Sequence, residues 1–161
     1  MFFRLKFLVA LTLLGLGSQC LAKPTNDHEH HWERFKDLKK CRYNTSNIGA
    51  ICKGYIRIHR DEESLKHALA AVGPISICVV AYIEDWKEYK GGVLNIPDCP
   101  NTTKYISHAV LLADYGQENG MDYWLVKNSW GESWCEKGYI KMSRNKNNQC
   151  GIATYATYPI V

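Results

Sequence analysis

The sequence has few of the features that point to metal, nucleic-acid or membrane binding. It contains no Cys-x-x-Cys pair, and its histidines do not fall at zinc-finger spacing, so a structural zinc site is not expected. The 20 Lys and Arg side chains only slightly outnumber the 16 Asp and Glu side chains, and no dense basic block occurs. A nucleic-acid partner is therefore not expected. The long apolar run near the N-terminus, Phe7–Leu16, is shorter than the ~20 residues that span a bilayer, so no membrane span is expected.

Three histidines, His28, His30 and His31, lie close together in the polar stretch Lys23–Lys40. Such a cluster can bind metal, but no second set of ligands accompanies it. Histidines in a charged tail are more often solvated. We therefore expect neither a metal nor any other cofactor.

The first residues have the pattern of a secretory signal peptide. Arg4 and Lys6 form a basic start, Phe7–Leu16 is apolar, and Cys20-Leu21-Ala22 places small residues at both recognition positions for cleavage after Ala22. The processed chain is thus predicted to enter the secretory pathway and to be extracellular or lysosomal, where disulfides persist.

Cysteine number agrees with this compartment. Cys20 leaves with the signal peptide, and the remaining six favour disulfides, although six cysteines allow fifteen connectivities. Two sequons, at Asn44 and Asn101, are predicted glycosylation sites.

Local patterns predict one amphipathic helix and several strands. Asp61 is the expected N-cap of a helix whose apolar residues recur at helical spacing from Leu65 to Val72, and Gly73-Pro74 ends it. A continuous apolar run, 75–81, predicts a strand buried on both faces, and 84–89 predicts a further helical turn.

A β-hairpin is predicted around Asn119-Gly120, with strands over 110–115 and 123–127. In antiparallel register about this turn, the numbers of paired residues sum to about 239. His108 and Asn128 sum to about 236 and so lie at the same open end. An asparagine oxygen there can accept from one ring N–H and leave the other ring nitrogen for a nucleophile, and Trp130 is placed to shield that bond. By themselves, these residues would more often belong to an ordinary surface.

From Cys41 to Val161, the sequence resembles the C-terminal half of a cathepsin L-like peptidase of the papain family. The resemblance implies an α+β fold, namely the right-hand domain with an antiparallel β-sheet or barrel and one amphipathic helix, without the left-hand helical domain. The expected segments are a signal peptide (1–22), a propeptide-like remnant (23–40) and the β domain (41–161). The matching stretches are Cys41-Arg42-Tyr43-Asn44, Gly73-Pro74-Ile75-Ser76, Gly91-Gly92-Val93, His108-Ala109-Val110, 122–131, Lys137-Gly138-Tyr139-Ile140 and 148–153, with Trp32–Lys36 similar to the start of a propeptide.

The resemblance also implies a role for individual residues. His108 would be the general base, Asn128 would orient it, and Trp130 would shield the pair. Part of the S2 specificity pocket would be lined by Ile106, Ser107, Ala109 and Tyr155.

Two disulfide predictions follow from the same resemblance. Cys99 and Cys150 match a pair within the right-hand domain. Cys41 matches a cysteine whose partner lies in the left-hand domain, and a local bridge from Cys41 to Cys52 is the expected replacement.

The chain departs from the family pattern at its most important position. The nucleophile motif Cys-Gly-Ser/Ala-Cys is absent, and the 107 residues before His108 leave no room for its usual spacing of roughly 130. Other departures are Ser107 for Asp or Asn, Asp114 for Gly, Cys135 for Gly, and Cys78 for a small core residue. Neither Cys78, in an apolar run, nor Cys135, in a loop, has the surroundings that activate a thiol.

We therefore predict a truncated peptidase homologue that is inactive alone. The alternatives are a decoy, inhibitor or binding protein of intact cysteine peptidases, and a splice form or incomplete gene model. A peptide ligand remains compatible with the half-cleft. Loss of the left-hand domain would expose apolar surface around Ile106, Trp130 and Trp134, which predicts self-association or pairing through that face.

Overall fold

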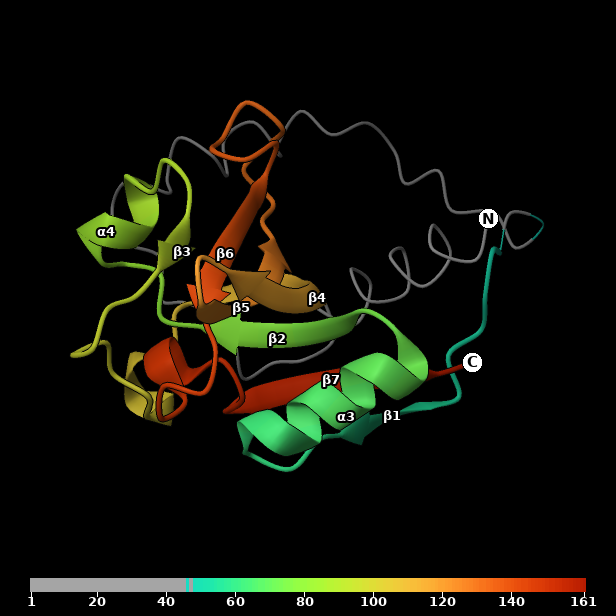
Figure 1. Cartoon of the computed structure of the whole chain (residues 1–161). Helices are drawn as coiled ribbons and strands as arrows, with labels where there is room; N and C mark the ends of the chain where they lie inside the picture. The colour runs from blue at the N-terminus through green and yellow to red at the C-terminus, as the bar shows by residue number, and fades with distance from the viewer. Residues whose placement is uncertain (1–45, 47) are drawn as a thin grey trace.

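The computed structural model describes residues 46 and 48–161. Within them, one seven-stranded sheet has the order β1-β7-β2-β4-β5-β6-β3 (Figure 1). All neighbours are antiparallel except β3 and β6. The strands are β1 (Gly54–Arg57), β2 (Ile75–Val79), β3 (Val93–Leu94), β4 (His108–Glu118), β5 (Met121–Lys127), β6 (Tyr139–Ser143) and β7 (Tyr155–Ile160). The helices are α3 (Glu62–Val72), α4 (Glu84–Lys87), and the 3-10 turns η3 (Thr103–Tyr105) and η4 (Gln149–Gly151). The predicted fold class is confirmed.

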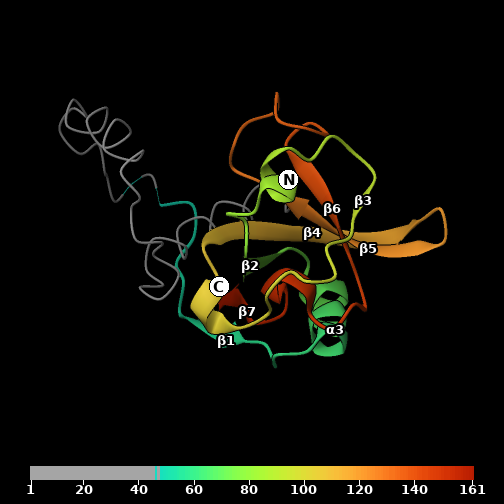
Figure 2. The ribbon, with the colours of Figure 1, turned by 90° about the vertical axis from the view of Figure 1, so that its left-hand side faces the viewer.

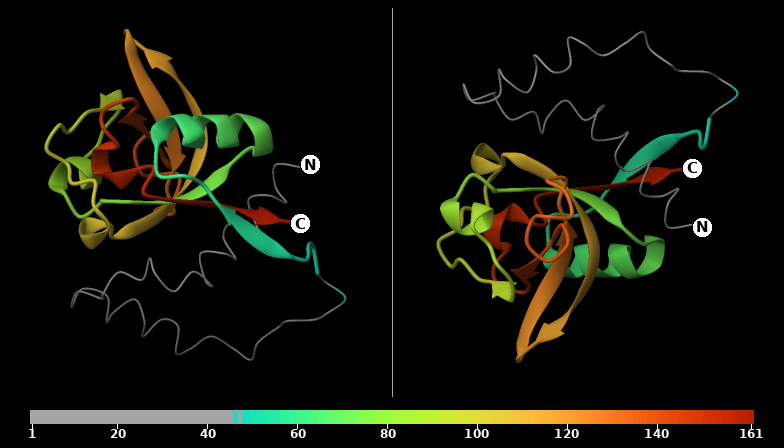
Figure 3. Two further views of the ribbon diagram at one scale, coloured as in Figure 1. Left: turned by 90° about the horizontal axis from the view of Figure 1, so that it is seen from below. Right: turned by 90° about the horizontal axis from the view of Figure 1, so that it is seen from above.

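Helix α3 begins and ends where the sequence predicts. The Asp61 side chain accepts a hydrogen bond from the Ser64 N–H at 2.6 Å, which caps the first turn. Gly73, with φ of 85°, ends the helix and donates its N–H to the Leu69 carbonyl. Leu65 and Leu69 are buried, and the helix packs against β2 and β4 on one side of the sheet (Figure 3).

The β4–β5 hairpin projects from the rest of the sheet (Figure 2). Asn119 and Gly120 both have positive φ, 51° and 79°, as a two-residue hairpin turn of the predicted kind requires. From Asp114–Leu125 to the turn, paired residue numbers sum to 239, and beyond an irregularity at 112–114 they sum to 238. The register prediction is therefore correct up to this bulge.

The bulge also explains how β4 accommodates the charged side chain of Asp114. The sequence predicted a charge in a strand that is normally apolar, yet Asp114 is exposed, and its carboxylate accepts from the Tyr115 N–H at 2.8 Å. The irregular register turns this side chain to solvent.

In the described part of the chain, no helix has the length and apolar character to cross a bilayer.

Candidate active site

The site lies where the two hairpin strands meet the rest of the sheet. His108 is the first residue of β4, and Asn128 directly follows β5. His108 Nε2 lies 2.9 Å from Asn128 Oδ1, so the hairpin brings together the two residues that the spacing placed at one end.

A second hydrogen bond fixes the direction of the first. Asn128 Oδ1 lies 2.8 Å from the Ser129 backbone N–H, which can only donate. The Asn128 atom that lies near both Ser129 N–H and His108 Nε2 must therefore be the amide oxygen. Because this oxygen can only accept, His108 Nε2 must carry the proton and donate it. In the neutral ring, this leaves Nδ1 with a lone pair. Among the described residues, no side chain bonds to Nδ1.

Burial favours the neutral form of this imidazole. Desolvation lowers the pKa of His108 below its usual 6.5, and the hydrogen bond to Asn128 opposes that shift less strongly. A neutral imidazole with a free Nδ1 can accept a proton from a thiol or hydroxyl placed beside it.

Two indoles contact the imidazole, and a third packs against both of them. Trp130 lies against it with ring centroids 5.3 Å apart, and Trp86 meets it edge-on at 5.6 Å. Trp86 also contacts Trp130 at 5.4 Å and stacks on Trp134 at 5.5 Å. Trp86 is fully buried, whereas Trp130 is 42% exposed. The inner wall of the site is therefore Trp86, and the outer cover is Trp130.

Sequence reasoning missed Trp86. The stretch around it predicted only a helical turn, and α4 is indeed one turn long. The available signal was the spacing of Trp86 and Tyr89, which places two aromatic rings on one helical face. Both residues are buried, and both contact Trp134.

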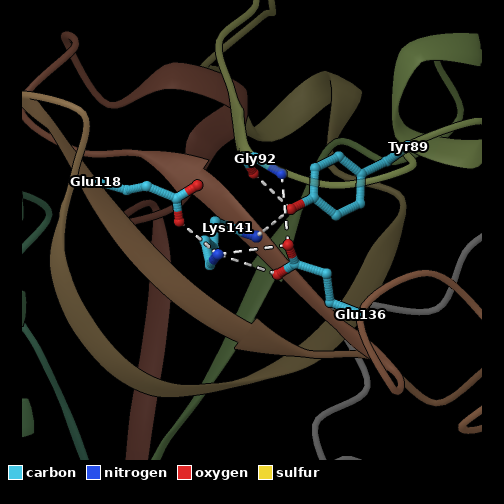
Figure 4. A network of polar contacts seen from close by, with 5 residues as sticks. All are labelled: Tyr89, Gly92, Glu118, Glu136 and Lys141. Carbon is cyan, nitrogen blue, oxygen red and sulfur yellow. Dashed lines mark hydrogen bonds and ion pairs between the residues drawn. The ribbon is translucent and has the colours of Figure 1, made fainter.

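A polar network fastens the segment after α4 to β6 (Figure 4). The Tyr89 hydroxyl donates to the Gly92 carbonyl at 2.5 Å and accepts from the Lys141 N–H at 3.3 Å. Lys141 Nζ lies 2.5 Å from the Glu118 carboxylate and 3.3 Å from that of Glu136. Burial raises the pKa of Tyr89 to about 12, so its hydroxyl stays protonated in this network. The network ties Tyr89, three residues after Trp86, to β6.

Comparison with known proteins places these residues in a family. The model of the papain family cysteine protease matches residues 19–160. This chain belongs to the papain family of cysteine proteases.

Several similar relatives are named as cathepsins or digestive cysteine proteinases. The chain is 50% identical over 123 residues to "Cathepsin L" of Sarcophaga peregrina, covering 75% of this chain and 36% of the relative. It is 51% identical over 122 residues to "Digestive cysteine proteinase 1" of Homarus americanus, covering 75% and 37%. Among solved structures, digestive procathepsin L2 proteinase of Tenebrio molitor superposes with a TM-score of 0.70 at 41% identity, over 76% of this chain and 38% of that chain.

The chain thus spans less than half the length of the relatives it matches.

The four residues that the papain-family resemblance assigns to the S2 pocket are spread along one end of the sheet. Ala109 and Tyr155 both lie opposite Cys78 of β2, one on each side. Ser107 instead accepts from the Ala81 N–H at 3.2 Å, so its hydroxyl supports the end of β2. Ile106, before β4, is half-buried near Gly151.

The cysteines confirm one predicted bridge and correct another. Cys99 and Cys150 form a disulfide with an S–S distance of 2.06 Å. The predicted Cys41–Cys52 bridge is wrong, because Cys52 is an exposed free thiol that donates to the Gly54 carbonyl at 3.0 Å. Cys78 is buried, as its apolar run predicts, and it is disulfide-bonded, which the sequence left open.

Cys135 is the other free thiol among the described residues. Burial raises the pKa of its thiol, which opposes formation of a nucleophilic thiolate.

The predictions on glycosylation and on the N-terminal segments stay predictions. Asn101 is partly exposed and its side-chain amide donates to the Asn147 carbonyl at 3.1 Å, which leaves its glycosylation open to test. Asn44, Cys41 and the segments 1–22 and 23–40 lie outside the described residues.

Proposed function

We propose that this chain carries the proton-transfer half of a papain-type thiol peptidase site and does not hydrolyse peptides by itself. The observation that supports the proposal most strongly is the His108–Asn128 pair, with Nε2 protonated and Nδ1 open. In thiol-dependent proteolysis, a thiolate attacks the peptide carbonyl, and an acyl-enzyme then forms and is hydrolysed. His108 would move the protons at Nδ1, and Asn128 would hold the ring.

The missing group is the thiol. The 161-residue sequence contains no Cys-Gly-Ser/Ala-Cys motif, and the two free thiols of the described residues are poorly suited to replace it. Cys52 precedes the edge strand β1, and the pKa of Cys135 is raised rather than lowered. A positioned base without a nucleophile and oxyanion donors gives little rate acceleration.

A fluorogenic peptide with a bulky apolar P2 residue tests this proposal. The processed chain is assayed under reducing conditions at mildly acidic pH, beside an active cathepsin L and a His108→Ala variant. We expect the chain and its variant to give the same background rate. Turnover that disappears both with a thiol alkylator and in His108→Ala would contradict the proposal.

A binding role is the second candidate, and the exposure of Trp130 favours it. A large indole that is 42% exposed beside a half-buried imidazole is apolar surface available to a partner. We propose that this face pairs with a second copy of the chain. Light scattering should then show a concentration-dependent dimer that Trp130→Ser weakens. A monomer at every concentration would contradict pairing.

We also propose that the chain enters the secretory pathway, to an extracellular or lysosomal destination. The basic and apolar segments before Ala22 and the Cys99–Cys150 disulfide support this location. N-terminal sequencing of the secreted chain should begin at Lys23.

A further inference from the structure

The outer edge of β1 has main-chain groups without a partner among the described residues. β1 lies at one end of the strand order, and its neighbour there is β7 (Figure 1). The Ile58 N–H donates to the Ala156 carbonyl at 3.0 Å, and bonding in an antiparallel ladder alternates from residue to residue. The main-chain groups of Arg57 and Tyr55 therefore point away from β7. This direction agrees with the pairing of Tyr55 opposite Pro159, which has no N–H.

The side chains beside this edge are apolar and exposed. Tyr55 is 63% exposed, and Ile56 of β1 and Ile160 of β7 are exposed as well. A free strand edge beside exposed apolar side chains is a template for pairing with another strand. Extended peptides bind to such edges through main-chain hydrogen bonds, and their side chains then give specificity.

The charge along this edge is of one sign. Residues 48–60 contain Lys53, Arg57 and Arg60 and no Asp or Glu. The guanidinium carbons of Arg57 and Arg60 lie 4.7 and 5.3 Å from the centroid of the Tyr155 ring. Among the described residues, no carboxylate forms an ion pair with these three side chains. Asp61, the next residue along the chain, instead caps α3. The edge therefore carries positive charge that no neighbouring side chain neutralises.

The sign of this charge decides between two occupants. A second copy of the chain, pairing antiparallel through the same edge, would bring the basic side chains of both copies together. Like charges on neighbouring strands are destabilising, and charged side chains on an edge guard against such self-pairing. We propose instead that the outer edge of β1 binds an extended acidic peptide segment, which adds a strand to the sheet.

The alternation of side chains along β1 defines the pattern of this segment. Successive side chains of a strand point to opposite faces, so Tyr55 and Arg57 lie on one face and Ile56 on the other. Oppositely charged pairs and apolar pairs across neighbouring strands are both favourable. The added strand should therefore carry Asp or Glu at alternate positions, on the face of Arg57. Apolar residues should lie between them, on the face of Ile56.

Fluorescence anisotropy tests the proposal with a labelled peptide of alternating Glu and Val. The peptide is titrated with the full secreted chain at low ionic strength, beside a peptide that has Lys in place of each Glu. We expect saturable binding of the Glu peptide that weakens as salt is added, and much weaker binding of the Lys peptide. No saturable binding of the Glu peptide, or equal binding of the two peptides, would overturn the proposal.

Tyr55→Pro tests the main-chain pairing. Proline removes the outward N–H, and this position tolerates proline because its N–H does not bond to β7. Tyr55→Thr is the matched control, since it removes the ring and keeps the N–H. Loss of one hydrogen bond should weaken binding of the Glu peptide about fivefold in Tyr55→Pro relative to Tyr55→Thr. Equal affinities would overturn strand addition.

If Tyr55→Pro fails to fold, a Glu peptide that is N-methylated at every residue takes its place, because it has no main-chain N–H to donate. We expect this peptide not to bind, and binding equal to that of the parent peptide would overturn strand addition.

Two further variants separate the occupants. Arg57→Glu should lower the affinity for the Glu peptide and raise that for the Lys peptide, and an unchanged preference would contradict charge recognition. In light scattering, a dimer that Tyr55→Pro dissolves would assign the edge to a second copy and overturn the acidic occupant. None of these readouts depends on His108 or on peptidase activity, so this proposal and the proposed function fail separately.

Discussion

Replacement of Trp86 by Ala should lower the free energy of unfolding and should also raise the pKa of His108, the candidate base. Trp86 is fully buried, and its ring contacts His108, Trp130 and Trp134. Truncation of a buried Trp to Ala costs about 3–5 kcal/mol, because the lost contacts leave a cavity. Total stabilities of domains are only about 5–15 kcal/mol. At roughly 4 °C per kcal/mol for a domain of this size, the melting temperature should fall by roughly 12–20 °C.

The same substitution should raise the pKa of His108. Burial is the main cause that lowers this pKa below 6.5, and removal of the indole allows water to approach the ring. Thermal melting followed by near-ultraviolet circular dichroism measures the first effect. Titration of the His108 ring signals by NMR, in variants that remain folded, measures the second, and Trp86→Phe provides the milder change.

Trp130→Ala is the matched control for Trp86→Ala, since it removes an indole of the same cluster that is 42% exposed. It should cost much less stability than Trp86→Ala. A melting temperature of Trp86→Ala equal to wild type, or a larger loss in Trp130→Ala, would refute the assignment of Trp86 as the inner wall.

Three further outcomes follow from the described contacts. Because the folded state lowers the pKa of His108, the unfolded state binds more protons at mildly acidic pH. The free energy of unfolding should therefore fall as the pH drops below about 6.5. In denaturant titrations, His108→Gln should show a weaker dependence of this free energy on pH. Asp61→Ala removes the cap of α3 and should cost about 0.5–2 kcal/mol in the same titrations, with Asp61→Asn nearly neutral. The Glu62 carboxylate accepts from the buried Trp124 Nε1 at 2.9 Å and from the backbone N–H groups of Asn145 and Asn148. Glu62→Ala should therefore cost at least about 1–3 kcal/mol, and Glu62→Gln, which keeps an acceptor, should cost less; equal losses would exclude these hydrogen bonds as the cause.

The hairpin and the helix could be predicted because local signals determine them. Asn119-Gly120 sets the turn, and the turn sets the register that brings His108 to Asn128. Asp61 and Gly73 mark the ends of α3 through capping, which depends on a few adjacent residues. The bulge near Asp114 has no comparable local signal, because it depends on how β4 fits both β2 and β5.

Long-range contacts have no local signal in the sequence. Trp86 lies more than twenty residues before His108 in the sequence, and its position depends on the packing of α4 and on the network around Lys141. The bonding state of Cys78 was likewise open, since an apolar run indicates that a cysteine is buried but not whether it is bonded. The Cys41–Cys52 prediction failed for the same reason, because closeness in sequence did not bring Cys52 to a partner.

The protonation of the His108 ring tests the central claim most directly. The Asn128 oxygen accepts from both Ser129 N–H and Nε2, so the neutral ring should carry its proton on Nε2 and leave Nδ1 open. Nitrogen-15 NMR of the labelled chain near neutral pH distinguishes the two nitrogens, and Asn128→Ala identifies the contribution of the amide. We predict that Nε2 is protonated in the wild type and that this preference weakens in Asn128→Ala. A ring protonated on Nδ1 in the wild type would contradict the assignment of this pair as the proton-transfer half of a thiol peptidase site.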